Sequence, residues 1–264
     1  MIARLTLRTL ALGYLALLLA FPVGMVFVRT FGEGIGPVWE AITRPAALHA
    51  LWLTVLVAVV AVAANTVFGV ICALVLVRHN FRGKALLNAV LDLPLAVSPV
   101  VVGFALLIVY GRTSLVGGWL AELGIRVVFS TPGIILATVF VSLPFVVREV
   151  VPVLREIGTE QEQAASTLGA SAFQTFRLVT LPAIRAGVAY GVVLTTARAL
   201  GEFGAVSVVS GKLSGQTETA TLFVEGQYQR FNATGAYAAS VVLALLALVT
   251  LLAMNLIKPK EQRG

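Results

Sequence analysis

Charged side chains are scarce in this sequence. Asp, Glu, Lys and Arg together make up 12% of its 264 residues, whereas soluble domains carry about 25%. Hydrophobic residues make up 59%, and the mean hydropathy is +0.97. Several apolar runs exceed the roughly 18 residues that mark a transmembrane helix. This composition excludes an ordinary soluble domain and predicts an integral membrane protein in contact with lipid.

Cysteine and histidine are also nearly absent. Cys72 is the single cysteine, so no disulfide can form within the chain. His49 and His79 flank an apolar run without any metal-ligand spacing. We therefore expect no metal site and no cofactor in this chain.

Motifs for hydrolysis are missing as well. The phosphate-binding pattern G-x-x-x-x-G-K-[ST] does not occur, and neither does the Gly-x-Ser-x-Gly nucleophile elbow. We expect no catalytic residue here, so any ATP hydrolysis linked to this chain must come from another subunit. The net charge of +7 is spread over loops, which indicates membrane topology rather than nucleic-acid binding.

The apolar runs predict an all-α membrane fold with six transmembrane helices, in a single domain over residues 1–264. The spans fall near residues 10–28, 51–77, 86–110, 132–147, 184–209 and 236–257. Pro94 and Pro99 interrupt the third span, which should be kinked or broken there. Asp92 is close to this interruption, and a charge is costly in lipid. We expect it at an interface or facing protein and water.

The distribution of lysine and arginine predicts the orientation. With the amino terminus inside, the cytoplasmic segments hold Arg4, Arg8, Arg78, Arg82, Lys84, Arg148, Arg155, Arg177, Arg185, Lys258, Lys260 and Arg263. The opposite side holds Arg29, Arg44, Arg112, Arg126, Lys212 and Arg230. Because positive residues favour the cytoplasmic side, both termini should be cytoplasmic.

A polar stretch lies between the fourth and fifth spans. Residues 159–182, here called the polar hairpin, read TEQEQAASTLGASAFQTFRLVTLP. Capping boxes of the S/T-x-x-E/Q type begin at Thr159 and Ser171, so a helix should start at each. Gly169 should end the first helix, and Leu181-Pro182 should end the second. The orientation places this helix–Gly–helix element in the cytoplasm.

The polar hairpin resembles the EAA loop of ABC-importer permeases. The spacing that carries the resemblance is Gln163-Ala164-Ala165-x3-Gly169-x9-Val179-x-Leu181-Pro182. It departs from the family at Gln163, where the motif has glutamate, and at Val179, where it has isoleucine. In that family the loop forms coupling helices that insert into a groove on the ATP-binding subunit. The alternative is a hairpin that only connects two spans.

The resemblance implies which residues contact an ATPase. They are Glu160, Glu162, Gln163, Ala164, Ala165, Gly169, Phe173, Phe176, Leu181 and Pro182. The two glutamates supply acidic groups near the variant position. The alanines permit close approach of a partner, and the two phenylalanines can fill apolar pockets on it.

Ionisable residues also occur in the fifth span. Arg198 and Glu202 are four residues apart and should share a helix face. Ala197, Gly201 and Ala205 form a small-xxx-small ridge that permits close helix packing. Arg198 either helps an anion along a translocation path, with Glu202 preventing tight trapping, or the two charges only neutralise each other or partners on neighbouring helices and so hold the bundle.

Several longer segments are similar to sulfate permeases of the CysW type. They are ARALGEFGAVSVVSGKLSGQT at 197–217, REVVPVLREIGTEQEQAASTLGAS at 148–171 and LDLPLAVSPVVVG in the third span. This resemblance implies the six-helix, MetI-like core of type I ABC importers and transport of sulfate, with thiosulfate as a further substrate. Arg198, Glu202, Asp92 and Ser98 are the candidates for the substrate path.

The resemblance also implies the partners. They are a CysA-like ATPase dimer that binds ATP and Mg, a second permease of the CysT type, and an extracytoplasmic sulfate-binding protein, all at the bacterial plasma membrane. Molybdate/tungstate permeases share the Gly-Glu-Phe-Gly-Ala segment, so a permease for those oxyanions is the first alternative. An ATP-independent anion transporter and a structural subunit without a pore are the others.

Overall fold

The computed structural model describes residues 2–32 and 34–257. Every regular element in these ranges is a helix, which confirms the all-α prediction. The elements in chain order are α1 (Ile2–Leu15), η1 (Ala16–Ala20), α2 (Phe21–Phe31), α3 (Ile35–Thr43), α4 (Pro45–Arg78), α5 (Lys84–Ala96), α6 (Pro99–Tyr110), α7 (Leu115–Glu122), α8 (Thr131–Glu156), α9 (Glu160–Thr167), α10 (Ala172–Thr175), η2 (Phe176–Thr180), α11 (Leu181–Leu200), α12 (Val206–Val209), α13 (Ala220–Gln229) and α14 (Ala233–Ile257), where η1 and η2 are single π-helical turns.

Within the described ranges, five helices are long and apolar enough to cross a membrane. They cover Thr6–Phe31, Pro45–Arg78, Thr131–Glu156, Ala172–Leu200 and Ala233–Thr250. The pair α5 and α6 passes the same test together but is bent by 112°, so it forms a broken sixth span or a re-entrant segment. The predicted spans are therefore present, with the third one divided.

The division of the third span has a local cause. Proline disfavours helical backbone at the residue before it, and Ser98, just before Pro99, is extended with ψ 133°. Val97 is extended too. Pro94 lies inside α5 without ending it, so of the two prolines only Pro99 marks the break.

The prediction for the fifth span was wrong at its end. α11 stops at Leu200, and a separate short helix, α12, follows after Gly201–Ala205. Glu202 therefore lies just beyond the helix that holds Arg198. The expected small-residue ridge on one helix does not form either. Instead, α6 approaches Ala205 so closely that a Cβ at Gly103 would lie 2.8 Å from its carbonyl oxygen.

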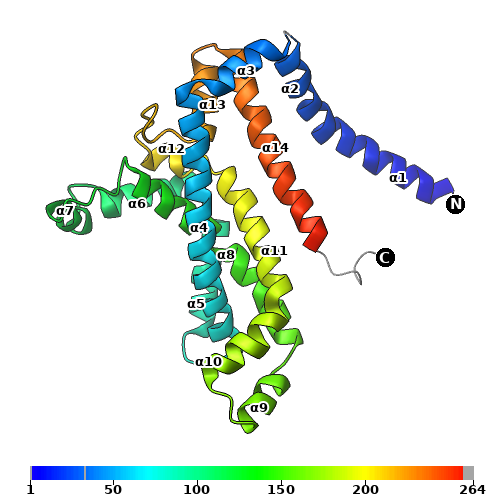
Figure 1. Cartoon of the computed structure of the whole chain (residues 1–264), viewed down its shortest axis with the longest axis vertical. Coiled ribbons are helices and arrows are strands. Elements are labelled where there is room, and N and C mark those ends of the chain that lie inside the picture. The colour runs from blue at the N-terminus through cyan, green and yellow to red at the C-terminus, as the bar shows by residue number, and fades with distance from the viewer. Residues whose placement is uncertain (1, 33, 258–264) are drawn as a thin grey trace.

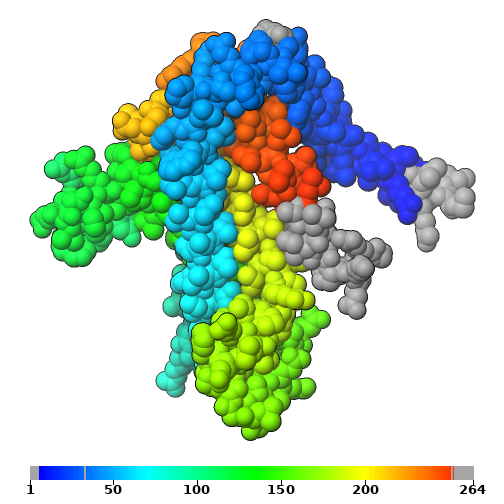
Figure 2. Space-filling view, in the orientation of Figure 1, coloured from blue at the N-terminus to red at the C-terminus, as the bar shows by residue number. Residues whose placement is uncertain are grey.

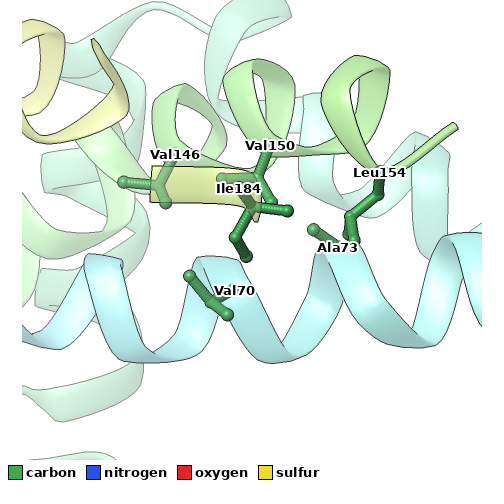
Figure 3. Close-up of a cluster of buried hydrophobic side chains, with 6 residues drawn as sticks. All are labelled: Val70, Ala73, Val146, Val150, Leu154 and Ile184. Atoms are coloured by element: carbon green, nitrogen blue, oxygen red, sulfur yellow. The ribbon is translucent and has the colours of Figure 1, made fainter. Parts of the chain in front are cut away.

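The central contact joins α4, α8 and α11. Val70 and Ala73 from α4 meet Val146, Val150 and Leu154 from α8, and Ile184 from α11 points into the space between them (Figure 3). Small residues make this approach possible, because a Cβ at Gly69 or Gly191 would lie 2.7 Å from an atom of Val146. In a membrane, helices are held together mainly by such close packing.

The molecule is elongated along these three helices (Figure 1). α9 and α10 lie at one end of the long axis, while α3 and α13 lie at the other. α6 and α7 project to one side, and α1 extends away on the opposite side (Figure 2). The polar hairpin is thus held at the tip of the packed helices.

We expect Gly191→Ala to lower the melting temperature of the detergent-purified protein. The added Cβ would meet the Val146 backbone at 2.7 Å, and forced overpacking costs about 1–3 kcal/mol. Gly13→Ala in α1 is the matched control, since a Cβ there meets nothing within 4 Å. Equal melting temperatures for the two variants would contradict the packing described.

Candidate coupling hairpin and translocation residues

The polar hairpin consists of α9, a glycine turn and α10, which continues into α11. Gly169 has φ +86°, a left-handed conformation that favours glycine at the end of a helix. Its N–H donates to Ser166 O at 3.0 Å, and the Ala170 N–H donates to Ala165 O at 3.1 Å. This is the Schellman pattern, so the prediction that Gly169 ends the first helix is confirmed.

The two predicted capping boxes have different outcomes. At Ser171 the box is present: Ser171 Oγ accepts from the Gln174 N–H at 3.3 Å, and Gln174 Oε1 accepts from the Ser171 N–H at 2.8 Å. At Thr159 no side-chain cap forms, so the predicted cap was wrong, although α9 does begin at the next residue, Glu160, as predicted. The Glu162 carboxylate is bound by Arg78 and Thr180 instead, and Thr159 Oγ1 accepts from Gln163 Nε2 at 3.1 Å.

Pro182 does not end the second helix, contrary to the prediction. Its ring would clash with the carbonyl four residues earlier in a regular α-helix. The π turn η2 removes this conflict, since the Leu181 N–H donates to Phe176 O, one residue further back than in an α-helix. One continuous helix, Ala172–Leu200, therefore joins the polar hairpin directly to the membrane span.

Side-chain exposure separates the predicted contact residues into two groups. Phe173 is 69% exposed, whereas Phe176 packs inward against the Val70–Ile184 core. The predicted contact of Phe176 with an ATPase is therefore corrected, because this side chain holds the hairpin to the bundle rather than facing outward. The remaining predicted residues are exposed or half-buried: Glu160, Gln163, Ala164, Gly169, Leu181 and Pro182 are exposed, and Glu162 and Ala165 are half-buried.

Leu168 is a surface residue that sequence reasoning missed. It is 89% exposed, immediately before the glycine turn. A large apolar side chain at the stop of a short polar helix was the available signal. Leu168 and the exposed Phe173 lie on the two arms of the polar hairpin, and we call these two residues the apolar pair.

Arg198 and Glu202 form an ion pair, as their spacing predicted. Arg198 Nη1 lies 2.6 Å from Glu202 Oε2, and the Glu202 side chain is only 2% exposed. Glu202 Oε1 also accepts from the Ala205 N–H at 2.8 Å, and the Glu202 carbonyl accepts from Thr221 Oγ1 at 2.8 Å. The buried Glu202 carboxylate thus binds both the backbone of the segment after α11 and the Arg198 side chain near the end of α11.

Asp92 belongs to a different ion pair. Both of its carboxylate oxygens are bound by Arg148 of α8, with Arg148 Nε donating to Asp92 Oδ1 at 2.7 Å. A cavity of about 220 Å³ beside them is also lined by Asn88 and Arg155. Ser98 is exposed at the break between α5 and α6. Three of the four candidate path residues therefore belong to two separate ion pairs, Arg198–Glu202 and Asp92–Arg148.

No metal site is apparent in the part of the chain that the structure describes. No group of three or more His, Cys, Asp or Glu side chains there could hold a metal ion. Cys72 is buried and free.

These features define a class: a multi-pass membrane protein whose apolar helices carry an exposed polar hairpin. Residues 65–263 match the family described as binding-protein-dependent transport system inner membrane component. The chain belongs to this family and is a multi-pass inner-membrane protein.

Two of the relatives of this chain are sulfate transport system permease proteins. The chain is 50% identical to the sulfate transport system permease protein CysW of Synechocystis sp. PCC 6803, over 97% of this chain and 92% of that protein. It is 37% identical to the sulfate transport system permease protein CysT of Escherichia coli K12, over 97% of this chain and 94% of that protein.

A solved structure shares the fold. A chain of a bacterial alginate ABC transporter, crystallised with an alginate pentasaccharide-bound periplasmic protein, aligns with a TM-score of 0.78 and 18% identity. The alignment covers 100% of this chain and 95% of that one. This likeness agrees with the predicted fold.

Proposed function

We propose that this chain is a permease subunit that moves sulfate, and thiosulfate with it, into the cytoplasm in an ATP-driven importer. Membership of the binding-protein-dependent family and the sulfate permease relatives support the transport role and the substrate. The chain binds no nucleotide itself. A separate ATPase dimer binds ATP and Mg and supplies the energy.

The observation that carries this proposal is the preorganised polar hairpin. A Schellman turn and a capping box fix its two arms, and the apolar pair projects from them. Because α10 continues into α11 without a break, a displacement of the hairpin by an ATPase also displaces the helix that holds Arg198. The hairpin is therefore the coupling element.

The positive residues near the polar hairpin support the predicted orientation. Arg78, Arg148, Arg155 and Arg177 belong to the hairpin-side halves of their elements or to the hairpin itself, which favours this end as cytoplasmic. Both chain termini are then cytoplasmic as well. Lys258, Lys260 and Arg263, which contributed to that prediction, lie outside the described residues.

The remaining partners complete the importer. Relatives of both the CysW and CysT kinds support pairing with a second, homologous permease around a shared pore. An extracytoplasmic binding protein delivers the anion. ATP-driven closure of the ATPase dimer draws the two hairpins together and opens the path outward, and hydrolysis resets it inward, which is alternating access between two states.

A competition assay tests the substrate. Radiolabelled sulfate uptake by the reconstituted importer should fall when unlabelled sulfate or thiosulfate is added and should persist with equal molybdate or tungstate. Stronger competition by molybdate or tungstate than by thiosulfate would instead assign the chain to that second group of oxyanions. Purification should also recover a non-identical permease, and a homodimer would contradict the proposed pairing.

Gly169→Val should uncouple the hairpin. A Cβ at this position meets nothing within 4 Å, so the penalty is conformational, about 1–2 kcal/mol for a left-handed residue with a side chain. We expect about a tenfold loss of ATPase stimulation by the loaded binding protein.

Gly169→Asn is the matched control for this prediction. Asparagine tolerates the left-handed conformation, so it should retain most of the stimulation. Equal stimulation by the valine and asparagine variants would show that the turn geometry is unimportant.

A further inference from the structure

Four groups from separate elements meet where the polar hairpin joins the bundle. Arg78 Nε, from the end of α4, lies 2.9 Å from Glu162 Oε2 of α9, and Arg78 Nη2 donates to Glu162 Oε1 at 3.2 Å. Thr180 Oγ1, at the end of η2, donates to the same Oε1 at 2.7 Å. Arg78 Nη1 donates to Leu154 O of α8 at 3.1 Å. We call this set the Arg78 node.

The Arg78 node is sheltered from solvent. The Arg78 and Glu162 side chains are 13% and 22% exposed, and Thr180 is buried. Hydrogen bonds to charged groups in such surroundings are stronger and more directional than those of exposed pairs. The geometry is also specific, because the planar guanidinium reaches both carboxylate oxygens and a carbonyl at once.

Helix ends explain why these groups gather here. Leu154 O belongs to the last turn of α8, where carbonyls lack partners within the helix and a positive charge is favourable. Glu162 lies in the first turn of α9, where a negative charge is favourable. Arg78 therefore stabilises the carboxyl end of α8, and Glu162 stabilises the amino end of α9. Together with Thr180, these contacts join α8, α9 and η2 to α4.

α9 has little else to hold it in place. None of its residues is buried, and it lies between two glycines with left-handed backbone, Gly158 at φ +63° and Gly169 at φ +86°. Apart from the backbone on either side, the Arg78 node is its main polar connection to the membrane helices. Without that connection, α9 could pivot on its flanking turns as its partner moved.

We propose that Glu162 is a positioning residue that clamps α9 to α4 and α8 through Arg78, so that the hairpin moves as one body with the membrane helices. This replaces the expectation that Glu162 contacts the ATPase. The inference rests on the proposed function, since it assumes that the polar hairpin docks on an ATPase. The docking itself is carried by the apolar pair, and the Arg78 node transmits the resulting displacement.

The test uses the complete importer with Arg78→Gln, Glu162→Gln and the double variant. Two quantities are measured: the amount of ATPase that co-purifies, and the ratio of ATPase activity with and without loaded binding protein. We expect normal co-purification and a ratio that falls about tenfold in each single variant. The double variant should be no worse than the singles, because both remove the same connection. Arg82→Gln removes an exposed cation from the same end and should leave the ratio unchanged.

Other results would overturn the inference. Unchanged ratios in the single variants, an equal loss in Arg82→Gln, or losses that multiply in the double variant would show that the clamp does not transmit motion. Loss of ATPase co-purification in Glu162→Gln alone would show that Glu162 touches the ATPase. In all these cases the proposed function stands if the wild-type permease retains its ATPase. Failure of the wild type to retain it would refute the proposed function instead.

Two variants of Thr180 test the same connection if the Arg78→Gln permease does not assemble with its partners. Thr180→Val removes one hydrogen bond to Glu162, whereas Thr180→Ser keeps it. The valine variant should lower the stimulation ratio and the serine variant should not. Equal ratios in these two variants would overturn the inference.

Discussion

Changing both Leu168 and Phe173 to serine should abolish retention of the ATPase by the purified permease. The two side chains are among the most exposed apolar groups of the polar hairpin, and no packing within the chain depends on their exposed surface. Truncating a buried aromatic or apolar anchor at an interface costs about 2 kcal/mol or more, which is roughly 30-fold in affinity. Two such losses on one small docking element should leave no stable complex.

The control for this variant is Leu115→Ser. Leu115 is as exposed as Leu168, but it lies on α7, which is far from α9 in the structure (Figure 1). It should retain the ATPase at the wild-type level. Retention by the hairpin double variant, or equal losses in both proteins, would contradict docking through the apolar pair.

Arg198→Ala should stop sulfate import. It removes the partner of a carboxylate that is 2% exposed, and leaving one member of a buried pair uncompensated costs about 3–5 kcal/mol. An unpaired Glu202 would also repel an oxyanion. The measurement is sulfate uptake into proteoliposomes at matched protein content.

A double variant separates the two roles of Arg198. Arg198→Ala with Glu202→Gln removes both charges, and the glutamine can still accept from the Ala205 N–H. If Arg198 contacts the anion, the double variant remains inactive. Recovered uptake would show that Arg198 only neutralises Glu202 within the bundle.

Arg198→Lys also tests whether Arg198 contacts the anion. A lysine keeps the charge but not the planar fork that suits an oxyanion. We expect assembly to be normal and uptake to fall clearly below the wild-type level. Wild-type uptake by this variant would remove the anion-contact role.

Much of the fold could be predicted from the sequence because the signals are local. Long apolar runs gave the spans, and the proline after Ser98 gave the break between α5 and α6. The Gly169 stop and the Ser171 capping box depend only on neighbouring backbone. In each case the determining contacts lie within a few residues.

The errors have a different origin. The capping box at Thr159 lacks its glutamate half because the Glu162 side chain binds Arg78, which is 84 residues away. Phe176 turned inward because a core built from α4, α8 and α11 receives it. The π turn before Pro182 lets a helix continue where a proline usually ends it. The pairing of Asp92 with Arg148 also joins distant segments. Such contacts are decided by tertiary packing, which sequence periodicity does not contain.

We propose that this permease imports sulfate only when a separate ATPase drives it through the polar hairpin. The most direct measurement is sulfate uptake into proteoliposomes that hold the permease pair, the binding protein and either active or hydrolysis-deficient ATPase, with ATP supplied on the ATPase side. We expect concentrative uptake with the active ATPase and none with the deficient one or without ATP. Equal uptake under all three conditions would contradict it.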